Sequence, residues 1–502
     1  MTLYVWTDEL LAKATDGRWQ GLTQTLSSTT ITTDTRTIKA GDVFLALTGE
    51  NFDGHDFILT AQQKGAVAVI AQRQTDSSLP HLLVDDGRVA LAKLGQYRRN
   101  AHPDLTMIAL TGSSGKTTTK EMLGAIFGQI APTLITRGNL NNDLGVPMML
   151  LELTDEHRFA IMELGANHVG EIAYTTELVR PNVACVLNIG TAHLGEFGGR
   201  DNIAKTKAEI FAGLLGNGVA VLPFGDEYYE VLRQQAEQYT THMLSFGERA
   251  VPLSQAGIDF ESMSELERAE FADIDSVLMM GDVFADDVEC GVQSSEFMLN
   301  VNLQVDEIDS EMIHMAFVGE HNISNALTAV ATAVGVPLPL IKSGLERAVP
   351  PKGRLTRTPF GKHVLIDDTY NANPTSVLAA AKVLVGEETQ KILVLGDIAE
   401  LGATAADEHD RLGQALAVLD IDIVLTVGEL MAYCSQAMNK IKPKLSTHFD
   451  SKAELLNALQ QLLTAGQSVV LFKGSRTARM ESIIHELVQS MDSSTASNNT
   501  GD

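Results

Sequence analysis

Short apolar runs alternate with polar turns along the chain, and their spacing predicts where strands and helices lie. Apolar runs of about four to eight residues between turn residues are typical of buried strands, and apolar positions at helical spacing are typical of amphipathic helices. Near the N-terminus, AVAVIA (66–71) and HLLVDD (81–86) predict strands. A polar cluster over residues 31–57 accompanies them, with glycine and acidic residues at 49–54 that predict a loop. We expect a small α/β domain over residues 1–84.

The second unit, expected over residues 85–350, opens with the apolar run MIAL (107–110), a glycine-rich turn and a helix. Met122, Leu123, Ile126 and Phe127 recur at helical spacing after the glycines. The runs FAIMELG (159–165) and VACVLNIG (183–190) predict further strands, and NALTAVATAVG (325–335) predicts a helix. The proline-rich segments PLPL (337–340) and PPKGR (350–354) close the unit.

The third unit, expected over residues 351–490, alternates strand and helix patterns. The predicted strands are HVLIDD (363–368), KILVLGD (391–397), DIVLTVG (422–428) and SVVLFKG (468–474). This rhythm predicts a Rossmann-like parallel sheet with helices on both faces, whose ligands bind beyond the carboxyl ends of the strands. Asp367, Asp368, Asp397 and Lys473 lie at those ends. The polar segment MDSSTASNNTGD (491–502) predicts a disordered tail.

The predicted fold is therefore a three-domain α/β protein with a mostly parallel central sheet, and 502 residues suit about three domains. The net charge of −27 disfavours nucleic-acid binding, because an acidic surface repels phosphate backbones. Sixteen acidic residues and only Arg268 as a basic one lie between Asp259 and Glu311, which favours a solvated face of surface and loops. Within this stretch, FADDVECGVQSS (284–295) is expected to interrupt a strand pair.

Cysteine usage and hydropathy indicate a cytoplasmic protein. Cys185, Cys290 and Cys434 are too few and too widely spaced for a disulfide framework or a zinc site. There is no run of about 18 apolar residues for a transmembrane helix. Asp8 and Glu9 stand where a signal peptide needs its apolar core. We expect no membrane insertion and a monomer.

The segment Thr111–Thr118, TGSSGKTT, predicts a phosphate-binding loop between the strand and the helix of the second unit. Glycines allow successive backbone N–H groups to face phosphate oxygens at the N-terminus of a helix. Lys116 supplies a charge for the β- and γ-phosphates, and the Thr117 hydroxyl can ligate Mg²⁺. Gly112 and Gly115 are separated by two residues, fewer than in the usual pattern. The residues expected to bind nucleotide here are Gly112, Ser113, Ser114, Gly115, Lys116, Thr117 and Thr118.

With this loop in place, the whole chain resembles the Mur ligase family. The resemblance is carried by TGSSGKTTTK (111–120), NLNNDLGVP (139–147), MELGANHVGEI (162–172), NIGTAHLGEFG (188–198), AKTKAEIF (204–211), GEHNISNAL (319–327), PPKGRL (350–355), DDTYNANP (367–374), LGDIAELG (395–402) and FKGSR (472–476). It implies ATP-driven amide formation through an acyl phosphate in peptidoglycan precursor synthesis. DTYNANP and KGSR look like the member that adds D-alanyl-D-alanine to UDP-N-acetylmuramoyl-tripeptide.

The resemblance also implies roles for single residues around ATP and two Mg²⁺ ions. The expected metal ligands are Thr117, Glu163, His193 and a Lys207 carbamylated by CO₂; Lys205 should face another way on its helix. The expected catalytic residues are Lys116, Lys207, His193 and Arg354. Asn325 is expected at adenine, with Asn322 as its helper or as a helix cap, Arg354 at the triphosphate and Asp367 at the ribose.

For the other substrates, the resemblance implies three groups of contacts. Asn371, Asn373, Lys473 and Arg476 are expected to hold D-alanyl-D-alanine. Asn139, Asn141 and Asn142 are expected to face the muramoyl peptide, although an Asn-rich turn is their alternative. Asp34 and Arg36 are expected at the uridine end, in the domain over residues 1–84.

Two alternatives remain open at this point. One is another amide ligase of the same fold, adding a different amino acid or adding glutamate to folate; the DNPR signature of the diaminopimelate-adding member does not occur here. The other is a phosphate-loop switch or motor acting on a macromolecule. That alternative predicts nucleotide turnover without a small-molecule acceptor and leaves TYNANP and KGSR unexplained.

Overall fold

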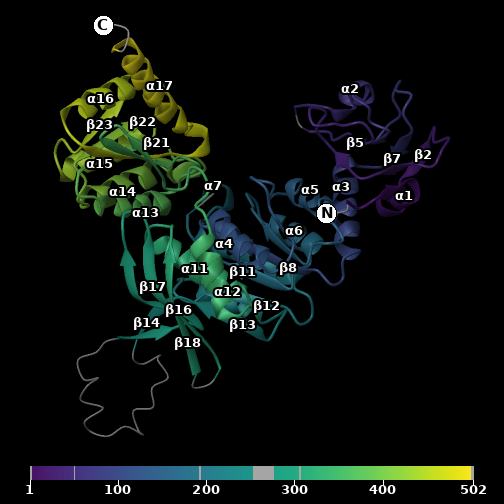
Figure 1. The fold of residues 1–502 in the computed structure, drawn as a ribbon, viewed down its shortest axis with the longest axis horizontal. Coiled ribbons are helices and arrows are strands. Elements are labelled where there is room, and N and C mark those ends of the chain that lie inside the picture. Colours follow the sequence, from purple (N-terminus) through teal and green to yellow (C-terminus); the bar gives the residue numbers. More distant parts are fainter. Residues whose placement is uncertain (1–2, 50, 192–193, 253–275, 305–306, 499–502) are drawn as a thin grey trace.

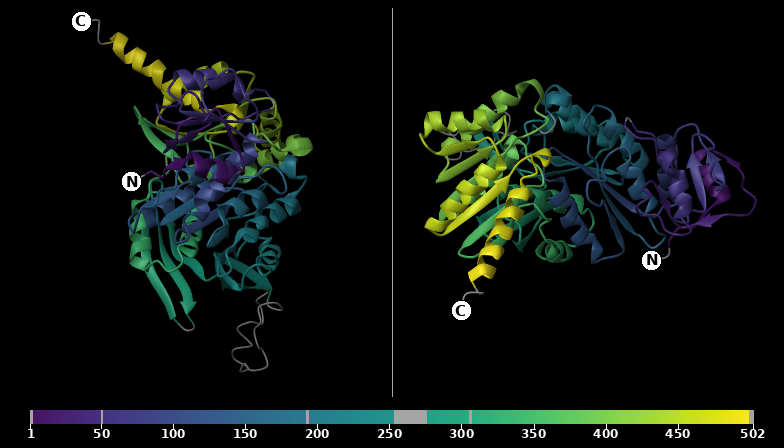
Figure 2. Two further views of the ribbon diagram at one scale, coloured as in Figure 1. Left: turned by 90° about the vertical axis from the view of Figure 1, so that its right-hand side faces the viewer. Right: turned by 90° about the horizontal axis from the view of Figure 1, so that it is seen from above.

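The computed structural model describes residues 3–49, 51–191, 194–252, 276–304 and 307–498. Three α/β domains lie in a row, each built around its own sheet (Figure 1). Seen from above, the central domain separates the N-terminal and C-terminal domains (Figure 2). This arrangement confirms the predicted three-domain α/β class.

The N-terminal domain contains a five-stranded sheet in the order β2-β7-β6-β5-β4. Its strands pair in parallel except at β2–β7. The predicted run AVAVIA forms β6, all four residues of which are buried. The elements are β1 (Trp6–Thr7), α1 (Asp8–Thr15), β2 (Arg18–Gln20), β3 (Ser27–Ser28), β4 (Ile31–Thr32), β5 (Val43–Leu45), η1 (Gly54–Phe57), α2 (Ile58–Gln63), β6 (Ala68–Ala71), β7 (His81–Leu83) and α3 (Gly87–Asn100).

Helix α3 belongs to two cores at once. Its Leu91 and Leu94 pack in the N-terminal core, and its Ala92 packs in the central core. A Cβ on Gly95 would lie 2.9 Å from Pro147 Cα, so α3 runs close against the central domain. The boundary predicted between residues 84 and 85 therefore falls just before a helix that two domains share.

The central domain contains a nine-stranded sheet in the order β18-β17-β16-β13-β12-β11-β8-β10-β9. The strands are parallel from β9 to β16, and β17 and β18 extend the sheet antiparallel. The elements before the hairpin extension are β8 (Thr106–Thr111), α4 (Lys116–Gly128), β9 (Thr133–Ile135), α5 (Gly145–Leu151), β10 (Phe159–Glu163), α6 (Glu171–Val179), β11 (Val183–Val186), α7 (Leu194–Phe197), α8 (Arg200–Ala208), η2 (Glu209–Gly213), β12 (Val219–Pro223), α9 (Tyr229–Ala236) and β13 (His242–Phe246). The later ones are β14 (Glu248–Pro252), β15 (Ser276–Met280), β16 (Val283–Cys290), β17 (Ser295–Gln304), β18 (Glu307–Met315), α11 (Glu320–Thr332) and α12 (Leu338–Arg347).

Both faces of the central sheet are buried, which explains why its strands read as continuous apolar runs. In β8, Ile108 and Leu110 pack under α4, α11 and α12, whereas Met107 and Ala109 pack under α5, α6 and α8. This alternation follows from the period of two in a strand. The loop after β8 consequently starts at the carboxyl edge of a fully buried sheet.

The expectation that residues 284–295 interrupt a strand pair is wrong, because residues 284–290 belong to β16 and residues 291–294 connect it to β17. β16 pairs antiparallel with β17, with an irregularity between Asp286 and Glu289. Phe297 and Leu299 of β17 are buried on alternate positions, and this apolar pattern outweighs the acidic composition. Asp286, Asp287 and Glu289 are exposed, as expected for the acidic stretch, but they lie on a strand and not in a loop. Residues 253–275 of that stretch are outside the described residues.

The C-terminal domain contains a six-stranded sheet in the order β19-β20-β24-β21-β22-β23, antiparallel only at β19–β20. Two buried clusters cover its faces, as predicted for a Rossmann-like domain. The elements are β19 (Thr356–Phe360), β20 (His363–Asp368), α13 (Pro374–Val385), β21 (Gln390–Gly396), η4 (Gly402–Thr404), α14 (Ala405–Ala417), β22 (Ile423–Val427), α15 (Met431–Ile441), β23 (Ser446–Phe449), α16 (Lys452–Ala465), β24 (Ser468–Lys473), η5 (Arg476–Ala478) and α17 (Glu481–Asn498).

The predicted disordered tail from residue 491 is corrected by α17, which continues to Asn498. The helix starts on the C-terminal core, where Ile483 and Leu487 are buried. Once a helix is nucleated, each added residue gains a hydrogen bond at small cost, so polar composition alone does not end it. Residues 499–502 lie outside the described residues.

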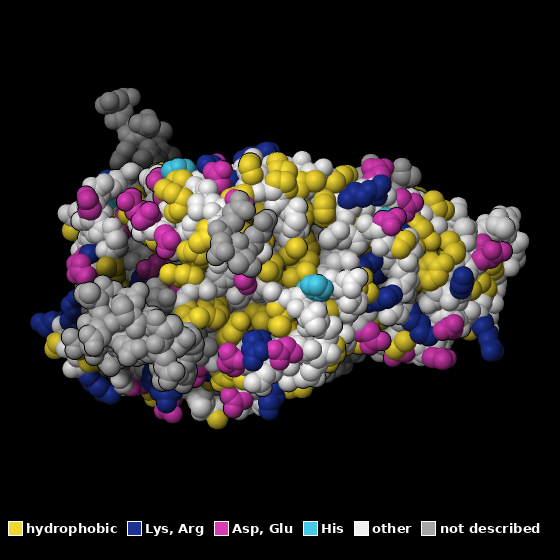
Figure 3. All heavy atoms as spheres, turned by 90° about the horizontal axis from the view of Figure 1, so that it is seen from below, with side chains coloured by type: hydrophobic (Ala, Val, Ile, Leu, Met, Phe, Trp, Pro, Cys, Tyr) yellow, Lys and Arg dark blue, Asp and Glu magenta, His cyan; other side chains and the backbone are white. Residues whose placement is uncertain are grey.

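All three cysteines are free, with Cys185 and Cys434 buried and Cys290 exposed. Within the described residues, no helix has the length and apolar content needed to cross a membrane. On the face shown in Figure 3, acidic and basic side chains lie interspersed between hydrophobic areas.

Candidate active site

Two adjoining cavities of about 620 and 510 Å³ lie where the central domain meets the C-terminal domain. Both are lined by Ser113, Ser114, Gly115 and Arg354. The first cavity is also lined by the predicted residues Lys116, Thr117, Asn139, Asn141, Asn142, Glu163, Lys207, Asn371, Asn373 and Arg476. The second is also lined by Thr118, Asn322, Asn325, Asn373 and Lys473. The structure thus brings residues about 360 positions apart in the chain into one cleft.

The phosphate loop leaves β8 and enters α4 as the sequence predicts, with Lys116 as the first residue of the helix. Asn188, just after the neighbouring strand β11, holds the loop through its backbone carbonyl and its side chain. Its Oδ1 accepts from the Ser114 N–H at 3.0 Å, and its Nδ2 donates to the Ser114 carbonyl at 3.1 Å. The Ser113 hydroxyl accepts from the Gly190 N–H at 2.8 Å. The loop backbone is therefore preorganised at the positive end of α4.

Gly115 is a point where only glycine fits. Its φ is 82°, in the left-handed region, and a Cβ there would overlap the Asn325 side chain. We expect Gly115→Ala to destabilise the protein by about 1–3 kcal/mol through strain and clash. It should also weaken nucleotide binding, because Asn325 must shift. Thermal unfolding and nucleotide titration would measure both effects, with Gly128→Ala as the control, because a Cβ there meets nothing within 4 Å. If the Gly115→Ala variant bound nucleotide as tightly as the wild type, the claim that only glycine fits at this position would be wrong.

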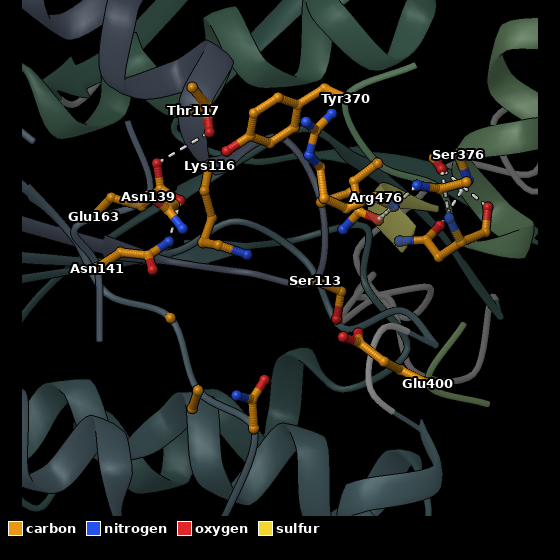
Figure 4. Close-up of a pocket in the computed structure, with 18 of the residues that line it drawn as sticks. Ser113, Lys116, Thr117, Asn139, Asn141, Glu163, Tyr370, Ser376, Glu400 and Arg476 are labelled. Atoms are coloured by element: carbon orange, nitrogen blue, oxygen red, sulfur yellow. Dashed lines mark hydrogen bonds between the residues drawn. The ribbon is translucent and has the colours of Figure 1, made fainter. Parts of the chain in front are cut away.

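Glu163 joins the phosphate loop to the Asn-rich turn. Its carboxylate accepts from the Thr117 hydroxyl at 3.1 Å and from Asn141 Nδ2 at 2.8 Å (Figure 4). Glu163 is 3% exposed and forms no salt bridge among the described residues, although its charge acts on Lys116. A buried carboxylate without a salt bridge is costly, so this arrangement suits a site that gains positive charge on binding.

Two lysines line the same cavity, the half-buried Lys116 and the buried Lys207. Burial lowers the pKa of Lys116; Glu163 opposes the shift and Arg354 adds to it. The pKa of Lys207 lies well below its usual value, first because of burial and then because of the neighbouring Lys116. Among the described residues, the Lys207 side chain has no hydrogen-bond or ion-pair partner. Lys205, two positions earlier on α8, is exposed, which confirms that the two lysines face different directions.

The residues of this cavity fit a hard divalent cation. Thr117 and Glu163 offer oxygen ligands, as Mg²⁺ prefers, and neither forms a salt bridge among the described residues. Among the described residues, there is no cluster of three or more His, Cys, Asp or Glu side chains that could hold a metal ion. His193 lies outside the described residues.

The two residues expected at adenine, Asn322 and Asn325, lie together and are hydrogen-bonded to each other. Asn325 Nδ2 donates to Asn322 Oδ1 at 3.0 Å, and Asn322 Nδ2 donates to the Val318 carbonyl at 2.9 Å. Asn322 therefore braces Asn325 from the first turn of α11. The Oδ1 atom of Asn325 lies against Gly115 of the phosphate loop.

The side chain of Asp367, the residue expected at the ribose, is held by Thr369. Its carboxylate accepts from the Thr369 N–H at 3.0 Å and from the Thr369 hydroxyl at 2.6 Å, and it lines neither cavity. The next residue, Asp368, lines the second cavity. Because successive side chains of a strand point to opposite faces, a choice between two adjacent aspartates cannot be made from composition.

The ammonium group of Lys473, a residue expected at the dipeptide, has partners within the protein. It is 1% exposed and donates to Asp368 Oδ2 at 2.5 Å and to the Asn371 carbonyl at 3.0 Å. A third, longer contact at 3.5 Å reaches the Asp368 carbonyl. An ammonium group has three donors, and these contacts engage them within the protein. Lys473 ties β24 to the end of β20 and to the Asn371 loop.

The other three residues expected at the dipeptide line the first cavity. Asn373 caps α13, accepting from the Ser376 N–H at 2.8 Å in a reciprocal capping box. Asn371 Oδ1 accepts from the Arg476 N–H at 3.3 Å. The Arg476 side chain is 63% exposed and pairs with Glu481 at 2.8 Å. Arg476 is therefore a cation at the cavity wall whose only described partner is a surface carboxylate.

Asp34 and Arg36 lie far along the row of domains and line neither cavity. They form an exposed pair, with Arg36 Nη2 at 2.7 Å from Asp34, and this pairing lowers the pKa of Asp34 to about 2. In the Asn-rich turn, Asn142 Oδ1 accepts from the Gly145 N–H at 2.9 Å at the start of α5. Asn142 thus has a structural role as well as a place in the cavity wall.

The sequence motifs did not single out several residues that line the cleft, although these residues lie inside the motifs. Asn188, Tyr370 and Glu400 belong to NIGTAHLGEFG, DDTYNANP and LGDIAELG respectively. Glu400 also marks a direct contact between domains, because its carbonyl accepts from the Gly195 N–H at 3.1 Å. Their position inside the family motifs was the signal that could have found them. Residue type alone did not distinguish them from their neighbours in the motifs.

Comparisons with known proteins cover all three domains. Residues 28–98 match the Mur ligase family catalytic domain, residues 110–333 the Mur ligase middle domain, and residues 353–476 the Mur ligase glutamate ligase domain.

Full-length relatives agree with these domain matches. The chain is 38% identical over 484 residues to the UDP-N-acetylmuramoyl-tripeptide–D-alanyl-D-alanine ligase of Escherichia coli (strain K12), covering 95% of this chain and 98% of that protein. It is 44% identical to a crystal structure of MurF from Acinetobacter baumannii, with a TM-score of 0.85 over 97% of this chain and 100% of the other. It is 28% identical to MurF ligase from Thermotoga maritima in complex with ADP, with a TM-score of 0.74 over 92% and 98% of the two chains. The chain therefore belongs to the Mur ligase family.

Proposed function

We propose that this protein adds D-alanyl-D-alanine to UDP-N-acetylmuramoyl-tripeptide, using ATP, in the cytoplasmic synthesis of peptidoglycan precursors. The observation that carries the proposal is the shared cleft, in which a phosphate loop of one domain faces the Asn371 and Arg476 region of another. The relatives named for this reaction match over nearly the whole chain, which supports the choice of substrates. The net charge of −27 favours this ligase over a nucleic-acid-directed motor.

The chemistry requires a carboxylate to attack the γ-phosphate of ATP, so two anions must approach each other. Lys116 and Arg354 lie on the cleft wall to screen that approach. The resulting acyl phosphate is attacked by the amine of the dipeptide, which loses a proton as phosphate leaves. Asn371 and Arg476 would hold the distal carboxylate of the dipeptide, and Asn139 and Asn141 would face the peptide. Bound nucleotide would place its base near Asn325.

Bound Mg²⁺ would neutralise negative charge between the carboxylate and the phosphates. Thr117 and Glu163 would hold it, with His193 and a carbamylated Lys207 as further ligands. The environment of Lys207 supports carbamylation, because a lysine of strongly lowered pKa has the neutral amine that attacks CO₂. The carbamate converts a repelling cation into an oxygen ligand. The protein is proposed to act as a monomer.

The experiment that tests the function is phosphate release from Mg·ATP with UDP-N-acetylmuramoyl-tripeptide, with and without D-alanyl-D-alanine. Mass spectrometry would follow the product. Turnover only with both acceptors, with formation of a UDP-N-acetylmuramoyl-pentapeptide, is the expected result. The control replaces the dipeptide with single amino acids. Preference for one of these would move the protein to another reaction of the same family, and phosphate release without any acceptor or amide product would exclude a ligase.

A further inference from the structure

Arg354 carries an unpaired positive charge inside the cleft. Within the described part of the chain, its side chain has no hydrogen bond and no ion pair, and its Nε is buried without a partner. It lines both cavities, between the phosphate loop and α13. Its charge helps to lower the pKa of Lys116 and of Lys473, so the guanidinium lies among cations. Repulsion from these neighbours should drive a flexible arginine away unless something holds it.

The ring of Tyr370 is the contact that holds it. The Arg354 Cζ lies 4.6 Å from the centre of that ring, within the range of a cation–π interaction. The two residues are also joined through their backbones, because the Tyr370 N–H donates to the Gly353 carbonyl at 3.3 Å. Gly353 has a φ of 71°, and a Cβ there would press on Tyr370 Cβ at 3.3 Å. The segment before β19 and the loop after β20 are thus packed together around this pair.

The orientation of the Tyr370 ring shows which wall of the cleft Arg354 and Tyr370 form. Tyr370 lines the first cavity, and Figure 4 shows its hydroxyl pointing towards the side where Thr117 and Glu163 lie. The ring therefore lies along the wall that faces the phosphate loop. Arg354 is held on this wall at a position from which it also reaches the second cavity.

We propose that Tyr370 is a positioning residue, whose ring face holds the Arg354 guanidinium ready for the phosphate groups of the nucleotide. The inference rests on the proposed ligase function. A carboxylate would hold an arginine as well, but it would neutralise the charge that phosphate needs. An aromatic face attracts the cation and leaves its N–H groups free to donate. The orphan Nε is one such free donor.

The test compares Tyr370→Leu, which removes the ring, with Tyr370→Phe, which keeps the ring and removes the hydroxyl. Tyr370→Leu should lower kcat/KM for ATP about tenfold, within the range measured for cation–π pairs. The KM for the UDP-tripeptide should stay within about twofold, and so should the activity of Tyr370→Phe. Tyr433→Leu, at an exposed tyrosine of α15 outside the cleft, is the matched control and should keep wild-type activity. An equal loss in Tyr370→Phe and Tyr370→Leu would overturn the proposal.

A double-mutant cycle with Arg354→Met separates positioning from a general structural role. Once the guanidinium is absent, Tyr370→Leu should change kcat/KM by less than about twofold. A further tenfold loss in that background would show that Tyr370 acts independently of Arg354 and would overturn the inference. Melting temperatures of all variants report folding. The proposed function is tested separately, on the wild-type protein, by whether it forms the UDP-N-acetylmuramoyl-pentapeptide.

Discussion

Lys207→Met is expected to reduce amide formation by about 10³-fold or more, a loss typical of removing a group that stabilises the transition state. Lys207 is 3% exposed, lines the first cavity and has a pKa well below the usual value because of burial and the nearby Lys116. As an ammonium group it would repel Mg²⁺, whereas its carbamate would bind the ion. Replacing a buried lysine by an apolar chain of similar length should leave the stability unchanged or higher.

The matched control for Lys207→Met is Lys205→Met. Lys205 is exposed on the same helix, so the substitution changes the same residue type without entering the cavity. Steady-state rates and melting temperatures of both variants decide the outcome. Lys205→Met should behave as the wild type. A Lys207→Met variant that kept more than about a tenth of the wild-type rate would exclude any essential role of a carbamate.

The dependence on CO₂ gives a second measurement of the same prediction. Only the neutral amine attacks CO₂, and the attack releases a proton. A lowered pKa makes the neutral form available at lower pH, and this form is lost as the pH falls below the folded-state pKa. Wild-type activity should therefore fall in CO₂-depleted buffer, recover with bicarbonate, and need more bicarbonate at lower pH. Activity indifferent to bicarbonate, together with unmodified Lys207 in a crystal structure of a nucleotide complex, would contradict carbamylation.

Lys116→Met is expected to reduce ATP-dependent ligation by about 10²–10³-fold, as when a preorganised donor to a developing anion is removed. Lys116 begins α4, and its Nζ now donates to the Gly112 carbonyl at 2.7 Å within the loop. With phosphates bound, this ammonium and the helix N-terminus would act on the same charge. Burial lowers the pKa of Lys116, so the ammonium charge is costly by itself. Bound phosphate groups would compensate that cost.

The loss in Lys116→Met should appear in turnover and not in stability. The melting temperature should be unchanged or higher, because a half-buried charge is removed. Lys391→Met is a suitable control: Lys391 is a buried lysine, but it lies on β21 and pairs with the exposed Asp420 at 2.5 Å. That control should keep its activity. A fall in melting temperature of Lys116→Met as large as in Lys391→Met would indicate a structural role for Lys116.

Most of the fold followed from local pattern. The predicted strands at residues 107–110, 159–165 and 363–368 became β8, β10 and β20, because both faces of each sheet are buried and the runs are continuously apolar. Errors arose where pattern and composition disagreed. The acidic residues of β16 and the polar end of α17 form regular structure, because hydrogen bonding with a packed neighbour outweighs an unfavourable composition.

The sequence by itself determined the phosphate loop, the order of the motifs and the family, since these depend on residue types at fixed spacing along one strand, turn and helix. Only the tertiary structure decided which side chains are free to act. Asp367 binds Thr369, whereas Asp368 lines the second cavity. Lys473 donates to Asp368 and to the Asn371 carbonyl. Arg354 has no ion pair among the described residues and lies against the ring of Tyr370. Whether a side chain has a free donor or an unpaired charge depends on partners from distant segments and other domains. The local sequence pattern does not predict those partners.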